Sequence, residues 1–329
     1  MQISPSPRAR RRAARAAAVA AAVLVAVAAT PSAAQAATRV QQWGTSGDVP
    51  FTGAFAAGGQ KADLAIYRPS TGQYSILLGN GSPVVHTLGG ALPAGQAWTP
   101  VVADFDGDGL TDTAVYHPRF ARPAAARWRV RLSTTGAVVD TTALDVSGTP
   151  VPADYDGDGR AEIAVFSAGT WSWRNLSTGR TGGDAWGTAG DVPVPARWNW
   201  HGPASLVDRA VWRPSTGEWF VKDALTGAGR VASRWGTTGD VPVVAAWACT
   251  DLATPTVYRP SQSTFMLDLA GAALSVRAGA AGDVAVAGDV VGDLRPDLTT
   301  WRPSTGVWTS TDLATFAPGL PACSLDGLN

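Results

Sequence analysis

The sequence predicts an all-β fold, a β-propeller of six four-stranded blades. Three observations lead to this prediction: one unit recurs six times, its length suits a four-stranded blade, and the first strand looks like the last strand of a blade. Frequent turns are expected from 37 Gly and 23 Pro, and a hydrophobic fraction of 45% is enough for a sizeable core.

The repeated unit contains an apolar strand, an acidic loop, a second apolar strand and a hairpin turn such as Pro-Ser-Thr-Gly. The residue that closes each acidic loop marks the six copies, which are Asp63, Asp112, Glu162, Asp208, Thr254 and Asp297. Successive copies lie 49, 50, 46, 46 and 43 residues apart. This period is typical of four-stranded propeller blades.

One copy illustrates the expected strands. The apolar segment Pro100–Ala103 precedes the acidic loop Asp104–Asp112, and a second apolar segment, Thr113–Tyr116, follows it. Apolar and polar residues then alternate over Trp128–Leu132, as in a strand with one solvated face. The turn 133–136 ends in Gly, which supplies the positive φ that such turns need.

The two ends of the repeat array predict how the ring closes. Arg39–Trp43 matches the strands that precede Trp186 and Trp235, whereas the last copy, Trp301–Leu313, has no such strand after it. We therefore expect the N-terminal strand to complete the C-terminal blade. A seventh blade is the alternative, although it would need about 47 more residues than the chain offers. An open solenoid is the competing architecture.

Residues 1–36 have the layout of a secretory signal peptide. A head with five Arg precedes the apolar run Ala16–Ala29, and small residues ending at Ala36 follow. We expect cleavage there and a secreted protein, free or associated with the cell surface. Arg11-Arg12 leaves twin-arginine export open, and a membrane anchor is disfavoured because the run is too short. The propeller should then occupy 37–313, followed by a C-terminal tail at 314–329.

Composition excludes several partners. Without residues 1–36 the chain has 21 basic and 26 acidic residues, so its net charge is −5 and a nucleic-acid partner is not expected. After residue 36 there is no stretch of about 20 apolar residues, so no membrane span is expected. We expect a monomer. Cys249 and Cys323 are the only cysteines. They form a disulfide in an oxidising compartment, or remain two thiols.

Two loops carry a complete acidic pattern. Carboxylates occupy positions one, three, five and nine, position seven offers a backbone carbonyl, and Gly at position six permits a sharp turn. The expected ligands are Asp104, Asp106, Asp108, Leu110 and Asp112 in the first loop, and Asp154, Asp156, Asp158, Arg160 and Glu162 in the second. Because Ca2+ takes roughly six to eight oxygen ligands, this pattern predicts Ca2+ in both loops. The alternative is a set of solvated acidic turn residues.

A third loop keeps part of the pattern. It has Asp289, Asp293 and Asp297 at positions one, five and nine, but Val291 and Leu294 replace the carboxylate and the Gly. Occupancy of this loop by Ca2+ is left open. The three remaining copies lack the pattern, and no Ca2+ is expected there.

With these loops and their spacing, residues 39–313 resemble the FG-GAP/VCBS repeat propellers, which share calcium loops with the integrin α-subunit propeller. The resemblance implies a β-propeller with calcium in blade loops and a binding or adhesion role. It implies no reaction.

The copies without intact loops share another pair of residues. Four copies have Asp in a Gly-Asp-Val segment before the first strand and Arg in an Arg-Pro segment after the second strand. The pairs are Asp48 with Arg68, Asp191 with Arg213, Asp240 with Arg259, and Asp283 with Arg302. The two calcium-loop copies lack both residues. We expect each Asp to pair with its Arg.

No catalytic motif is evident, and the three His residues lie in none. The irregular segment Trp198-Asn199-Trp200-His201 places aromatic side chains beside polar groups, and it is our candidate ligand site. We expect a calcium-binding module for carbohydrate or a cell-surface protein partner. A polysaccharide-degrading enzyme, either lyase or hydrolase, and a structural scaffold are the alternatives.

Overall fold

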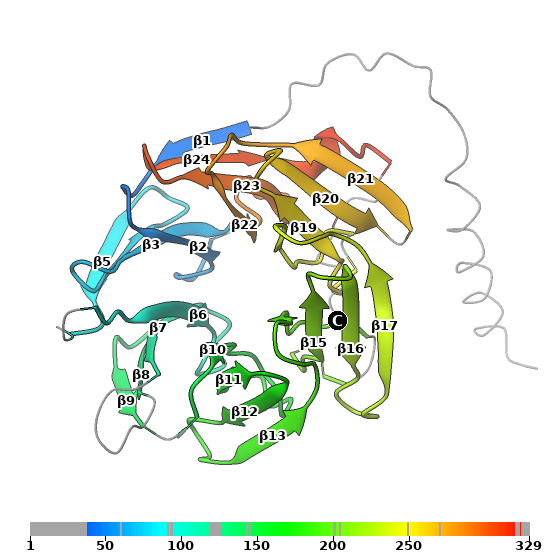
Figure 1. The fold of residues 1–329 in the computed structure, drawn as a ribbon. Helices are drawn as coiled ribbons and strands as arrows, with labels where there is room; N and C mark the ends of the chain where they lie inside the picture. Colours follow the sequence, from blue (N-terminus) through cyan, green and yellow to red (C-terminus); the bar gives the residue numbers. More distant parts are fainter. Residues whose placement is uncertain are drawn as a thin grey trace, which may run out of the picture. The chain divides into compact units, whose positions relative to one another are not determined.

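The computed structural model contains six antiparallel sheets of four strands each, arranged around a ring (Figure 1). It describes residues 38–59, 61–90, 92, 95–118, 127–142, 144, 146–199, 202–203, 205–248, 250–269, 271–319 and 323. The predicted signal peptide, Trp200, His201 and Cys249 lie outside this part, so the leader and the disulfide remain predictions. Among the described residues, no helix is long and apolar enough to cross a bilayer.

The blades are numbered in chain order. Blade one comprises β2 (Val49–Gly53), β3 (Asp63–Arg68), β4 (Gln73–Leu77) and β5 (Pro83–Thr87). Blade two comprises β6 (Thr99–Ala103), β7 (Asp112–His117), β8 (Arg127–Arg131) and β9 (Val138–Thr141). Blade three comprises β10 (Thr149–Pro150), β11 (Ile163–Ser167), β12 (Thr170–Arg174) and β13 (Thr181–Ala185).

Blade four comprises β14 (Val192–Pro193), β15 (Arg209–Arg213), β16 (Glu218–Lys222) and β17 (Gly229–Arg234). Blade five comprises β18 (Val241–Pro242), β19 (Thr256–Arg259), β20 (Thr264–Leu269) and β21 (Ala272–Arg277). Blade six comprises β22 (Val284–Gly288), β23 (Asp297–Arg302), β24 (Val307–Thr311) and the N-terminal strand β1 (Thr38–Gln42). A 3₁₀ turn, η1 (Leu313–Thr315), follows β24.

The N-terminal strand closes the ring as the sequence predicts. β1 pairs antiparallel with β24, with Val40 opposite Thr309. The backbone N–H of Trp43 donates to Gly306 O, just as Trp235 N–H donates to Gly217 O within blade four. The sixth blade is therefore built from both ends of the repeat array, and the six-bladed prediction is confirmed against seven blades and an open solenoid.

Neighbouring blades form the core by covering each other's faces. The second strands are buried almost throughout, whereas the third strands alternate between buried and partly exposed residues. Ile163 and Val165 of blade three pack with Tyr116 and Trp128 of blade two. Removing such apolar surface from water is what holds separate sheets together.

Tryptophan side chains join successive blades. The indole N–H groups of Trp43, Trp186 and Trp235 donate to backbone carbonyls of the third strand in the following blade, at Ser75, Phe220 and Met266. The indole groups of Trp212 and Trp219 both donate to Trp235 O. These tryptophans are therefore packing residues with satisfied polar edges, in line with their regular spacing.

Backbone hydrogen bonds also connect the acidic loops of neighbouring blades. At five junctions, the residue just before the loop-closing residue donates its N–H to the carbonyl of the first residue of the preceding loop. The donors are Ala62, Thr111, Ala161, Val207 and Ala253, and their acceptors are Asp289, Ala54, Asp104, Asp154 and Arg197. In blade six this position is Pro296, which has no N–H to donate.

All four expected Asp–Arg pairs are present. Arginine Nε and Nη2 donate to the two carboxylate oxygens over 2.7–3.0 Å, in bidentate geometry. The Asp side chains are only 1–2% exposed, so the carboxylates depend on these donors. The pairs are Arg68–Asp48, Arg213–Asp191, Arg259–Asp240 and Arg302–Asp283.

The pairs and the acidic loops lie at opposite ends of a blade. In blade one, Asp48 precedes β2 and Arg68 ends β3, whereas the loop joins the other ends of these two antiparallel strands. An ion pair in one blade therefore does not take the place of a loop-bound ion in another. The pair ties the first strand to the second at one end, and an ion in a loop would do so at the other.

We expect Arg213→Ala to reduce the free energy of unfolding by about 1–3 kcal/mol, because it leaves the buried Asp191 carboxylate without its charged donor. The matched control is Arg234→Ala in the same blade, where the arginine side chain is 75% exposed and should contribute under about 1 kcal/mol. Urea denaturation measures both variants. Equal losses would contradict a stabilising role for the pair.

Candidate metal centre

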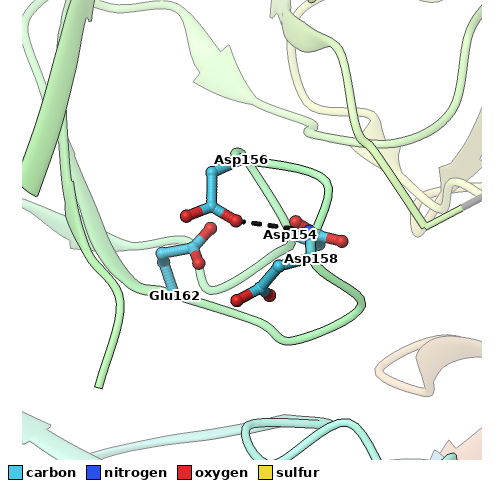
Figure 2. Close-up of side chains that lie close together, drawn as sticks. All are labelled: Asp154, Asp156, Asp158 and Glu162. Atoms are coloured by element: carbon cyan, nitrogen blue, oxygen red, sulfur yellow. Dashed lines mark hydrogen bonds between the residues drawn. The ribbon is translucent and has the colours of Figure 1, made fainter. Parts of the chain in front are cut away.

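Three groups of acidic side chains are close enough to share an ion. In each group, one carboxylate oxygen per residue lies within 4.8 Å of the others. The groups are Asp154 with Asp156, Asp158 and Glu162; Asp104 with Asp106 and Asp108; and Asp293 with Asp297 and Asp312. Figure 2 shows the four side chains of the first group gathered in a single loop.

The loop backbone holds the position-one carboxylate in place. Asp154 accepts hydrogen bonds from Gly157 N–H at 2.6 Å and from Gly159 N–H at 2.8 Å. Both glycines have positive φ, +81° and +88°, which aims their N–H groups inward. Asp104 is held in the same way by Gly107 and Gly109. The two intact loops therefore share one backbone geometry.

Glu162 reaches the other carboxylates of its loop while remaining hydrogen-bonded on both oxygens. Its Oε2 accepts from Tyr155 N–H at 2.7 Å, and its Oε1 accepts from the Asn175 amide at 2.9 Å. The same amide donates to Asp158 at 2.9 Å and to Asp156 at 3.4 Å. One neutral amide thus faces three carboxylates, which leaves most of the negative charge uncompensated.

In the first loop, the predicted ligand Asp112 is not part of the acidic group. Its two oxygens accept from Phe105 N–H at 2.9 Å and Ser133 N–H at 2.6 Å. Asp is one methylene shorter than Glu, so these backbone bonds hold its carboxylate back from the positions that Glu162 reaches. The first loop gathers three carboxylates, and the second gathers four.

The position-nine carboxylate also has a structural role without an acidic group. Asp63 accepts from Phe55 N–H and Gly79 N–H, and Asp208 accepts from Trp198 N–H and Ala224 N–H. In each case the carboxylate links the start of the loop to the turn after the third strand. Position nine therefore fastens the loop whether or not the other ligand positions are kept.

The third loop groups different residues from those predicted. Asp293 and Asp297 are brought together, but Asp289 is not in their group, and Asp312 is. Asp289 accepts from the N–H groups of Gly292, Asp293 and Leu294. Leu294 keeps the left-handed turn with a φ of +70°, so this loop retains the backbone path although the Gly is lost.

The position-seven carbonyls of Leu110 and Arg160 stay predicted ligands. Each of these carbonyls shares its peptide unit with the N–H of the next residue, and those of Thr111 and Ala161 donate to Ala54 O and Asp104 O at 2.7 Å, which orients both carbonyls. The Arg160 guanidinium points elsewhere and donates to Ser177 Oγ at 2.7 Å.

Burial makes several of these carboxyl groups weaker acids than usual, because it raises their pKa. Burial is the main cause that raises the pKa of Asp112 to about 6, and it raises the pKa of Glu162 and of Asp297 to about 7. Neighbouring carboxylates add to each increase. A bound cation would favour the ionised forms and oppose these shifts.

Sequence reasoning missed Asn175 and Asp312, which lie outside the nine-residue loops. Both follow a buried third-strand Trp by four residues, at Trp171 and Trp308, and Asp223 follows Trp219 in the same way. A recurring Asn or Asp at this distance was the available signal. It shows that the segment directly after the third strand contributes polar groups to the loop end of the blade.

The predicted ligand segment is only partly described. Trp198 is 5% exposed and packs with Val194 and Trp219, so most of its ring serves the core. It occupies loop position two, as Phe105 and Tyr155 do in their blades. Asn199 donates to Asp208 at 3.0 Å and accepts from Arg230 at 3.1 Å. Trp200 and His201 lie outside the described residues.

A groove of about 600 Å³ lies beside this segment, between blades four and five. Its polar lining includes Arg230, Ser233 and Asp268, and the Ser233 hydroxyl donates to Asp268 at 2.7 Å. The groove offers charged and neutral hydrogen-bonding groups on neighbouring, well-packed strands.

No known protein-family model matches the chain, and no curated protein matches it. Among solved structures, a streptogramin B lyase is 10% identical with a TM-score of 0.49, and the alignment covers 84% of this chain and 97% of the lyase. Virginiamycin B lyase from Staphylococcus aureus is 11% identical with a TM-score of 0.47, covering 84% of this chain and 99% of that one. These likenesses transfer no activity to this chain.

The raised pKa values predict how metal-free stability depends on pH. A carboxyl group with a raised pKa binds more protons in the folded than in the unfolded protein. The free energy of unfolding should therefore fall as the pH rises from about 4 to about 7. Saturating Ca2+ should remove this decrease, so that Ca2+ raises the melting temperature more at pH 8 than at pH 5.

Thermal denaturation in chelator and in Ca2+ at both pH values measures the effect. Glu162→Gln removes one of the shifted groups and should reduce the pH dependence in chelator. An equal Ca2+ effect at pH 5 and pH 8 would contradict the prediction.

Proposed function

We propose that this chain is a secreted, calcium-binding six-bladed propeller that acts as a binding module. The observation that carries the calcium assignment is the group of four carboxylates within 4.8 Å of one another, with a single amide among them. Such a concentration of negative charge favours a cation, and all the donors are hard oxygen atoms. Ca2+ suits a flexible oxygen set better than Mg2+, which demands a tighter octahedron.

The ions would act mainly on the structure of one end of the blades. Ala161 N–H donates to the Asp104 carbonyl, so the two intact loops are joined directly by backbone. An ion in either loop would therefore restrain its neighbour as well. Modules outside the cell commonly bind Ca2+ weakly, with dissociation constants of about 10⁻⁴ to 10⁻³ M, which fits a secreted protein.

Calorimetric titration of metal-free protein should detect Ca2+ uptake at up to millimolar concentration. At 100 times the dissociation constant, each ion should stabilise the fold by about 2.7 kcal/mol. Asp106→Asn and Asp156→Asn should each weaken one site by at least roughly tenfold, because each removes a charged ligand. Asp251→Asn, in the corresponding loop of blade five, is the control and should leave uptake unchanged. Absence of heat with the wild-type protein would overturn the calcium assignment.

For the ligand we propose carbohydrate bound in the groove between blades four and five. Arg230 and Asp268 provide a charged donor and a charged acceptor there, and Ser233 adds a hydroxyl. Closely spaced donors and acceptors suit the hydroxyl groups of a sugar. In support of binding rather than catalysis, the acidic groups of three or more in the described part of the chain all lie in the loops assigned to ions or beside them.

A glycan array with and without chelator tests the ligand class. We expect binding by the wild-type protein and a loss of at least roughly tenfold in affinity for Arg230→Ala, which removes the charged donor of the groove. Arg234→Ala is the matched control, because Arg234 lies on the same strand and its side chain is 75% exposed. Failure to bind any glycan would reject carbohydrate in favour of a protein partner.

A further inference from the structure

The acidic group of blade six is assembled from two separate segments. Asp293 lies in the loop before β23 and Asp297 begins that strand, whereas Asp312 directly follows β24. β23 and β24 are paired, with Leu298 opposite Thr311, so the two segments meet at one end of the sheet. This arrangement differs from the two intact loops, in which all grouped carboxylates come from nine consecutive residues.

One oxygen of Asp297 has no hydrogen-bond partner although the residue is fully buried. Its Oδ2 accepts from Val290 N–H at 2.6 Å and Val291 N–H at 2.8 Å. Its Oδ1 is removed from solvent and has no partner, and the residue itself is 0% exposed. A buried carboxylate oxygen in this state is costly unless a ligand satisfies it.

The corresponding oxygens in blades one to four are satisfied, and blade five has Thr254 instead of a carboxylate. Position nine accepts a second hydrogen bond from Gly79 N–H in blade one, Ser133 N–H in blade two, the Asn175 amide in blade three and Ala224 N–H in blade four. In blade six the chain turns into η1 at this place, so no such donor reaches Asp297.

Asp312 is oriented by that same turn. Its Oδ1 accepts from Ala314 N–H at 2.7 Å as the N-cap of η1. No hydrogen bond to its Oδ2 occurs within the described part of the chain, and the same holds for Oδ2 of Asp293. Burial and the nearby Asp312 and Asp289 raise the pKa of the Asp293 carboxyl group, whereas Arg295 interacts electrostatically with it and lowers the pKa. One guanidinium near Asp293 thus faces three neighbouring carboxylates.

We propose that Asp293, Asp297 and Asp312 form a third divalent-cation site, in which Asp312 supplies the carboxylate that Val291 no longer provides at position three. The ligand is Ca2+, since three carboxylates with water offer only hard oxygen donors. The Asp289 side chain shapes this loop by accepting hydrogen bonds from backbone N–H groups, and it is not one of the grouped ligands. This inference rests on the proposed calcium-binding function, and it adds a site with a different ligand set.

The test is calorimetric titration of metal-free full-length protein with Ca2+. The double variant Asp106→Asn/Asp156→Asn isolates the third site and should still bind one ion per chain. Adding Asp312→Asn should abolish this uptake. Asn remains a good N-cap through its own oxygen, so η1 should persist in this variant. Asp223→Asn, at the equivalent place in blade four, is the matched control and should leave the remaining ion bound.

The outcomes separate this proposal from the function on which it depends. Uptake by the wild-type protein but none by the double variant would overturn the third site and retain the two loop sites. Uptake that persists after Asp312→Asn would reject Asp312 as a ligand. No uptake by any variant would remove both proposals, and circular dichroism of each variant confirms that the fold is intact.

Discussion

A carboxylate that closes the acidic loop in every blade except blade five, which has Thr254, is the contact on which the loop end of the blade depends. In blades one to four it accepts one hydrogen bond from the start of the loop and a second from the turn after the third strand. The first, second and third strands are thereby tied at one point. Because the N–H of the preceding residue also bonds to the neighbouring loop at five junctions, this fixed point is shared around the ring.

The hydrogen bonds of the position-nine carboxylate do not depend on the other carboxylates of the loop, which a metal would need. Blade one keeps Asp63 and its two backbone hydrogen bonds although its loop has lost the other carboxylates. The loop can therefore lose an ion without losing its attachment. Blade six differs from blade one. It keeps the position-nine carboxylate, Asp297, but has no hydrogen-bond donor for its second oxygen, and Asp312 lies nearby. The same repeat supports both results because backbone donors hold the position-nine carboxylate in both blades without a metal.

The repeat was enough to predict the blades, the closing strand and the four Asp–Arg pairs, because each recurs at a fixed distance along the chain. It was insufficient for residues that act across a hairpin. Asn175 and Asp312 approach the loops only because the third strand returns beside the second. Trp198 was expected at a ligand surface; its register with Phe105 and Tyr155 packs it in the core, and it also lines the groove between blades four and five. Asp112 matched the ligand pattern, and the competing backbone donors became visible only in three dimensions.

Polar ties at the two ends of the first strand add to its backbone pairing with the second strand. β10, β14 and β18 each have two residues, but the pairing continues past them: in blade three Val151 N–H donates to Ala164 O, and Ala153 forms a bridge with Glu162. Blades four and five add a bidentate Asp–Arg pair at the open end. Blades two and three have Thr and Ser or His in place of that pair, so their side-chain tie between the two strands lies at the loop end. An ion there would compensate more negative charge in the 154–162 loop, where four carboxylates meet, than in the 104–112 loop, where three do.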